Sequence, residues 1–325
     1  MTTFERQSRA LGTTAMMMAL ALICRSPAAQ AETLRIGKAG AEAISFVPAD
    51  IGQTLGIFKK HGIDITISAF GGDPKIQQAM AADGIDIGLG SGPGMAFIAK
   101  GSPVKAVAAT ADQPLDFLLV GRNDGSVPTL ADLKGRKVGV SGVGSVTNWL
   151  VTEIARQHGW GVEGIPRVGL GNDANRIAAL KTKSVDAVIV NVAVALRYVH
   201  SGEGKVLARF SDLVKDFHDH VIFATNKIIK AKPEAVRGFL AGWFETVKFM
   251  RANKAKTVEM AKTVMHTDDA TAAAIYDEVM PSFNEDGHFK PKALAALARS
   301  YVALKTLPKE PDMSTLYTEA FLPSN

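Results

Sequence analysis

The segment at residues 63–90 reads IDITISAFGGDPKIQQAMAADGIDIGLG. Its first part, 63–70, alternates apolar and polar residues and predicts a strand, and 73–82 predicts a helix with Pro74 at its first position. A further apolar run at 85–90 predicts a second strand. A strand, a helix and a strand in this order form a βαβ unit, whose two strands lie parallel in one sheet.

The same alternation extends along most of the chain and predicts an α/β fold with parallel sheets. Further strands are expected at 34–38, 104–110, 117–122, 137–141, 168–171, 185–190, 206–210 and 221–225, and further helices at 48–60, 145–157, 174–181 and up to residue 199. A turn-rich stretch at 123–128 separates two such series. Beyond 225 the pattern is helical and adds no strands, so this part must pack on a lobe that is already built. The chain then crosses between two lobes twice, near 115–125 and 219–227, and two crossings make a hinge.

The N-terminus has the layout of a secretory signal. A basic start with Arg6 and Arg9 precedes an uncharged, largely apolar run at 11–24, and the small residues Ala-Gln-Ala end at Ala31. Cys24 follows an isoleucine, whereas a lipoprotein signal needs a small residue there. We therefore expect cleavage after Ala31 and a periplasmic protein without a lipid anchor. The alternative is a buried N-terminal helix, but no helix cap precedes the run.

The composition of the remaining chain limits its function. Without the leader the chain carries 34 basic and 31 acidic residues, a net charge of +3, and no cysteine, since the single cysteine lies in the leader. A small excess of basic residues spread along the chain does not indicate a nucleic-acid surface. The length suits about two domains of ~150 residues. No apolar stretch is long enough for a membrane span, and disulfides are excluded.

Enzyme motifs are missing from the sequence. The seven histidines form no H-E-x-x-H pattern, and there is no G-x-S-x-G elbow and no P-loop. Gly142 and Gly144 do not complete a G-x-G-x-x-G. His218 and His220 flank one aspartate, so on an extended strand their rings share a face, but a third metal ligand is not evident. We expect no catalytic residue, no metal and no cofactor.

Six short segments carry a resemblance to a known family through their order and spacing. They are PA at 48–49, GIFKKHGIDI at 56–65, GIDIG at 84–88, GSPVK at 101–105, LADLKGRKVGV at 130–140 and SVDA at 184–187. Over roughly 32–260 the chain resembles the solute-binding proteins of nitrate, sulfonate and taurine ABC transporters, which share a fold with the yeast-type thiamine-pyrimidine synthases.

The resemblance implies a type II periplasmic binding fold: two lobes, each with a mixed, mostly parallel sheet, joined by a two-crossing hinge. We expect lobe one at 32–118, lobe two at 119–222 and a mostly helical return to lobe one at 223–325. The implied function is extracytoplasmic capture of a small molecule by a monomer, which delivers it to the permease and ATPase of an ABC importer. Thiamine-pyrimidine precursor binding, a synthesis-type enzyme and a ligand sensor for a membrane signalling partner are the alternatives. The family's enzymes use a cysteine-rich motif, from which this chain departs.

Ligands of open parallel sheets gather beyond the carboxyl ends of the strands, where helix N-termini and free amides converge. The loops that follow the predicted strands therefore supply the candidate ligand-binding residues. These are Lys38, Ile44, Ser45, Phe46, Ser91, Gly92, Pro93, Gly144, Ser145, Val146, Thr147 and Asn191.

The loop at 142–147 reads GVGSVT and predicts an anion site, because its hydroxyls and free amides lie at the positive end of a helix. An ordinary turn with Ser145 as helix cap is the alternative. Lys38 either supplies a positive charge to the ligand from the opposite side of the cleft or is an exposed lysine at a strand end. Asn191 either donates its side-chain amide to the ligand or caps the next helix. With Phe46 among the apolar candidates, an organic sulfonate or carboxylate ranks above nitrate. Trp149 is expected in the core more than on the cleft wall.

Overall fold

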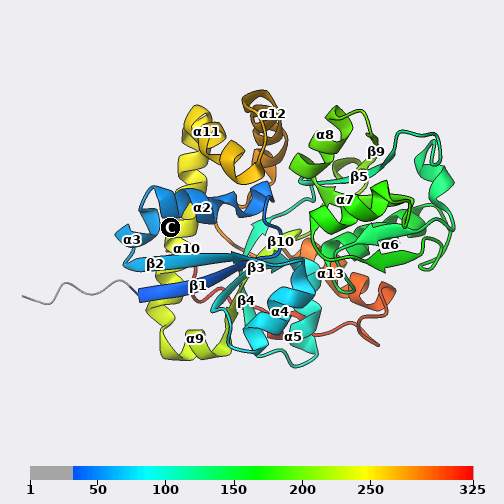
Figure 1. Cartoon of the computed structure of the whole chain (residues 1–325). Coiled ribbons are helices and arrows are strands. Elements are labelled where there is room, and N and C mark those ends of the chain that lie inside the picture. Colours follow the sequence, from blue (N-terminus) through cyan, green and yellow to red (C-terminus); the bar gives the residue numbers. More distant parts are fainter. Residues whose placement is uncertain (1–31, 325) are drawn as a thin grey trace, which may run out of the picture.

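The computed structural model describes residues 32–324 (Figure 1). The predicted leader and its cleavage site lie outside the described residues. The first sheet has the strand order β2-β1-β3-β10-β4, and β10 runs opposite to the other four strands. Its strands are β1 (Glu32–Lys38), β2 (Ile63–Ala69), β3 (Ile87–Ser91), β4 (Val104–Ala111) and β10 (His220–Thr225).

The second sheet repeats this arrangement with the order β7-β6-β8-β5-β9, in which β5 is the antiparallel strand. Its strands are β5 (Phe117–Arg122), β6 (Val138–Val140), β7 (Arg167–Gly169), β8 (Ala187–Asn191) and β9 (Gly204–Arg209). The central strands β8 and β5 are buried throughout, which explains their continuous apolar runs, whereas the edge strands are partly exposed.

Helices cover both sheets (Figure 1). The α-helices are α2 (Val47–Thr54), α3 (Ile57–Lys60), α4 (Asp73–Ala81), α5 (Ala96–Ala99), α6 (Val146–Gln157), α7 (Asp173–Lys181), α8 (Val192–His200), α9 (Asn226–Ala231), α10 (Pro233–Ala252), α11 (Lys254–Met265), α12 (Asp269–Val279) and α13 (Pro291–Ala303). Short 3-10 turns are η1 (Ile44–Phe46), η2 (Gly92–Met95), η3 (Leu130–Leu133), η4 (Phe210–Asp212), η5 (Met280–Ser282) and η6 (Met313–Thr315). The helix predicted over 48–60 is divided into α2 and α3 by Gly56, whose φ of 69° is left-handed.

The predicted two-lobed α/β architecture is confirmed, but the crossings lie earlier than expected. The chain passes between the sheets at 112–116 and 210–219. The second crossing is not at 219–227, because residues 220–225 already pair with β3 and β4. The predicted boundaries at 118/119 and 222/223 cut through β5 and β10, so we propose lobe boundaries that keep each strand within its own sheet.

The C-terminal helices return to the first lobe. Helix α10 packs on α2 and α3, and its Phe239 stacks on Phe58 with ring centroids 5.2 Å apart. Helix α12 contacts α8 of the second lobe, so the helical part touches both lobes (Figure 1). Among residues 32–324 no helix has the length and apolar character needed to cross a membrane.

Candidate functional site

A cavity lies where loops of the two lobes meet. With the lobes in contact its volume is about 30 Å³. The first lobe supplies the loops that follow β1, β2 and β3, and the second lobe supplies those that follow β6 and β8. The lining residues are Ala39, Gly40, Ala43, Phe46, Gly72, Asp73, Gly90, Ser91, Phe117, Ser141, Val146, Thr147, Arg176, Asn191 and His220.

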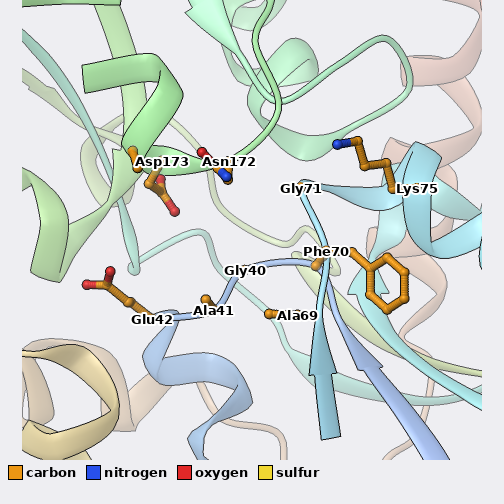
Figure 2. A pocket seen from close by; sticks show the side chains of 11 residues that line it. Gly40, Ala41, Glu42, Ala69, Phe70, Gly71, Lys75, Asn172 and Asp173 are labelled. Carbon is orange, nitrogen blue, oxygen red and sulfur yellow. The ribbon is translucent and has the colours of Figure 1, made fainter. Parts of the chain in front are cut away.

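The cavity shares Ala39 and Gly40 with an outer hollow of about 350 Å³. Figure 2 shows this hollow, with Glu42 of the first lobe facing Asp173 of the second. Lys75 lines the hollow from α4. The outer hollow is therefore lined by charged side chains from both lobes.

The two lobes touch at the cavity, so the structure is a closed arrangement. A Cβ on Gly71 would lie 3.0 Å from the backbone nitrogen of Asn172 in the opposite lobe. A Cβ on Gly72, whose φ is +99°, would lie 2.8 Å from Oγ of Ser141. These two glycines let the backbones approach where a side chain would hold the lobes apart.

In each lobe an aspartate beside the cavity accepts two hydrogen bonds from one residue at the end of a strand. In the first lobe Ser91 donates its backbone N–H and its hydroxyl to Asp73, at 2.6 and 2.8 Å. In the second lobe Asn191 donates its backbone N–H and Nδ2 to Asp173, at 3.1 and 2.7 Å. In both lobes an aspartate that begins a helix is thus joined to the end of the next strand, and the loops are fixed by buried hydrogen bonds.

Arg176 is the cationic side chain that the second lobe presents to the cavity. It is 3% exposed and lies one turn into α7. Nη2 donates to Asp173 at 2.6 Å, Nη1 to the carbonyl of Ile189 at 2.5 Å, and Nε to the carbonyl of Asn172 at 3.4 Å. The guanidinium is therefore held in one orientation at the cavity wall.

The N-terminus of α6 lies on the cavity, but its hydroxyls are used within the turn. Ser145 caps the helix by accepting the N–H of Asn148 at 3.2 Å, and its hydroxyl donates to the carbonyl of Gly142 at 2.7 Å. Thr147 Oγ1 accepts the N–H of Ser141 at 2.9 Å. The capping alternative for Ser145 is thus correct, and the first N–H groups of α6 remain without intrahelical acceptors.

The structure places Lys38 away from its expected role. Its ammonium pairs with both carboxylate oxygens of Asp50 in α2, at 2.8 and 3.0 Å, and it does not line the cavity. One N–H of Asn191 Nδ2 donates to Asp173, and Oδ1 is buried without a hydrogen-bond partner.

Other predicted residues divide into two groups. On the cavity lie Phe46, Ser91, Val146, Thr147 and Asn191; behind it lie Ile44, Ser45, Gly92, Pro93, Gly144 and Ser145. The hydroxyl of Ser45 points to Asp116, at 2.7 Å, and not to the cavity. Trp149 stacks on Phe217 with centroids 3.8 Å apart, which agrees with its expected packing role. Ligand contact by these residues remains a prediction.

His220 forms part of the cavity floor between two phenylalanines. Its ring centroid lies 4.8 Å from that of Phe46 and 5.8 Å from that of Phe117. Its Nε2 lies 3.0 Å from Asp116 Oδ2. Burial by itself would lower the pKa of His220, but Asp219 and Asp116 together raise it to about 10. The floor of the cavity is therefore aromatic and charged.

Sequence reasoning missed Arg176, Asp73 and His220 as cavity residues. His220 begins β10, the strand assigned from its apolar run, and a bulge in the pairing of β10 with β4 falls beside it. Arg176 follows the loop after β7 by one turn, so extending the search to the first turn of each helix would have included it. His218 and His220 do not share a site: His218 Nδ1 pairs with Asp112 at 2.9 Å.

Comparison with known proteins places the chain. The family model described as NMT1/THI5 like matches residues 44–257. A Brucella abortus protein named as a binding protein is 26% identical over 222 residues, which cover 68% of each chain. The 4-amino-5-hydroxymethyl-2-methylpyrimidine phosphate synthase THI11 of Saccharomyces cerevisiae is 24% identical over 255 residues, covering 75% of this chain and 70% of the yeast protein.

Among solved structures, the alkanesulfonate-binding protein SsuA from Xanthomonas axonopodis pv. citri, bound to MOPS, has a TM-score of 0.77 at 19% identity. The match covers 88% of this chain and 98% of that protein, and at this identity it shows the fold alone. The architecture is thus the two-lobed periplasmic binding fold, as expected. The chain belongs to the NMT1/THI5-like family.

Proposed function

We propose that this chain is an extracytoplasmic receptor that captures a small organic anion between its lobes and delivers it to an ABC importer. Sulfonates, carboxylates and taurine-like molecules are the solutes we favour. A binding role agrees with the two-lobed fold, the closed interlobe cavity and the names of the relatives with this fold. Signal cleavage and a periplasmic location are part of the proposal.

The observation that carries the proposal is Arg176. A guanidinium has five N–H groups, and the described contacts with Asp173, Ile189 and Asn172 use three of them. The remaining N–H groups are available to a ligand oxygen, because the side chain lines the cavity. A planar guanidinium suits the paired oxygens of a carboxylate or sulfonate better than a lysine ammonium does.

The helix α6 strengthens this assignment. Val146 and Thr147 line the cavity in the first turn of α6, where N–H groups face outward and the helix dipole is positive. Phe46 and Phe117 provide an apolar wall for the body of the solute. Both anchors of the anion belong to the second lobe, and the wall comes from the region where the lobes meet.

A second candidate is a thiamine-pyrimidine precursor. The rings of Phe46 and Phe117 around His220 would suit a flat heterocycle, and yeast relatives are named as pyrimidine phosphate synthases. Asn191 lines the cavity, and its buried Oδ1 has no hydrogen-bond partner, so a ring amino group could serve as its donor. If the bound ligand is chemically altered and not released unchanged, the chain is an enzyme and not a receptor.

A thermal-shift screen tests the proposal directly. The panel contains organic sulfonates, carboxylates, taurine, nitrate and aminopyrimidines, and a ligand at 100 times its Kd stabilises the protein by about 2.7 kcal/mol. We expect an organic anion as the strongest hit, recovered unchanged by mass spectrometry after incubation. A strongest hit among the aminopyrimidines, or a chemically altered hit, would replace the proposal by the second candidate.

The importer is tested separately by cross-linking in the native host. We expect a membrane permease of the ABC class to be captured with the receptor. Capture of a membrane signalling protein in its place would support the sensor alternative and leave the solute assignment intact.

A further inference from the structure

Three buried side chains meet where the two crossing segments pass beneath the cavity. Asp116 ends the first crossing, Asp219 ends the second, and His220 begins β10. Their exposed fractions are 1%, 0% and 2%. His220 Nε2 lies 3.0 Å from Asp116 Oδ2 and 3.2 Å from Asp219 Oδ2. One ligand atom from each residue thus lies within 4.8 Å of the other two.

The carboxylates of this cluster lack the hydrogen bonds that their burial requires. Neither oxygen of Asp219 has a hydrogen-bond partner, and Asp116 Oδ1 also lacks one. By contrast, Asp73, buried to the same degree, has both oxygens engaged by Ser91. A buried carboxylate without donors is costly, so these oxygens require positive charge beside them, from a protonated His220, a shared proton or a bound cation.

Charge balance requires about two positive charges at this cluster. Two carboxylates and a neutral imidazole carry a charge of −2, and a fully buried group must be close to neutral. Two protons can supply the balance, one on His220 and one shared between the aspartates. A single divalent cation would supply the same charge.

We propose that Asp116, Asp219 and His220 bind a divalent metal ion of the zinc type. An imidazole nitrogen with two carboxylate oxygens is a ligand set that Zn²⁺ accepts, at about 2.0–2.2 Å from each atom. Ligand atoms at that distance in a tetrahedron lie roughly 3.3 Å apart, close to the 3.0 and 3.2 Å seen around Nε2. The ion would connect the two crossing segments and thereby stiffen the hinge beneath the solute. Asp116 lies 104 residues from His220, so the sequence could not show the third ligand.

Titration of the EDTA-treated, untagged exported protein with ZnCl₂ tests the site. Calorimetry should give one ion per chain, and measurements in buffers of different ionisation enthalpy at pH 7 should show release of about two protons per ion. Co²⁺ should give the strong visible absorption of a tetrahedral complex. Absence of 1:1 binding at millimolar Zn²⁺ would overturn the proposal and leave the two-proton state as the explanation.

Matched variants separate this site from adventitious binding. Asp219→Asn and His220→Gln should each weaken Zn²⁺ binding at least 10-fold, whereas His218→Gln, which alters the neighbouring histidine that pairs with Asp112, should bind Zn²⁺ as the parent does. Circular dichroism checks that each variant is folded. The Co²⁺ spectrum of Asp219→Asn provides a second readout of metal binding, in a variant whose side chain has nearly the same volume as the original. Equal affinity in Asp219→Asn and the parent would contradict the assignment. Solute affinity measured in EDTA reports on the proposed receptor function independently.

Discussion

Arg197 offers a specific test of lobe closure, because its side chain joins the two lobes. From α8 of the second lobe, Nη2 lies 2.5 Å from Glu42 Oε2, and Nη1 lies 2.5 Å from the carbonyl of Met265 at the end of α11. Replacing Arg197 by Gln removes a partly exposed ion pair, worth up to ~1 kcal/mol, and a hydrogen bond to a carbonyl, worth about 1 kcal/mol. A loss of about 1–2 kcal/mol shifts the closed-to-open ratio by about 5- to 30-fold.

Small-angle scattering and calorimetry measure the effect. We expect Arg197→Gln to have a larger radius of gyration without solute and a higher Kd with it, since the binding-competent closed form is less populated. Lys181→Gln is the matched control, because Lys181 pairs with Glu203 within the second lobe at 2.9 Å. An unchanged radius and Kd in Arg197→Gln, or equal changes in both variants, would show that this contact does not control closure.

Three further predictions concern the cavity. Arg176→Lys keeps a charge beside Asp173 but loses the planar fork, so we expect the Kd for the organic anion to rise about 10- to 100-fold in calorimetry; an unchanged Kd would remove Arg176 from the site. Ser145→Ala removes the α6 cap and should lower the free energy of unfolding by about 1 kcal/mol in urea titration. It should change the solute Kd less than Arg176→Lys does. A larger change of Kd in Ser145→Ala than in Arg176→Lys would show that the Ser145 hydroxyl anchors the anion. His220, whose folded pKa of about 10 exceeds its ordinary 6.5, should stabilise the metal-free fold fully below pH 6.5 and lose that contribution as pH rises through about 10. The Tm of the parent should therefore fall over this range more than that of His220→Gln, and parallel profiles would contradict the charge assignment.

The sequence predicted the order of strands and helices well because that order depends on local periodicity. Strand 117–122 and helix 146–157 lie within a residue of their predicted bounds, since the strand is a short apolar run and the helix repeats apolar residues at helical spacing. The split at Gly56 was missed, because a glycine near a helix end can either be tolerated or take a left-handed conformation. The crossings were displaced because β10 joins the first sheet through partners more than a hundred residues away.

The candidate site was predicted less completely, since it depends on pairings between distant residues. Following strand ends identified Val146, Thr147 and Asn191, which all line the cavity. Lys38 has the expected place in the chain, yet its side chain pairs with Asp50 and does not line the cavity, whereas Arg176 does. Nothing local distinguishes such a paired lysine from a free one, so tertiary contacts decide its role.

The most direct test of the receptor assignment is a crystal structure with the tightest organic anion found in the screen. We expect the ligand in the cavity between the lobes, with its anionic oxygens within hydrogen-bond distance of Arg176 and of the first N–H groups of α6, and its body against Phe46. A ligand bound outside this cavity, or one whose anionic group faces away from Arg176, would contradict this expectation.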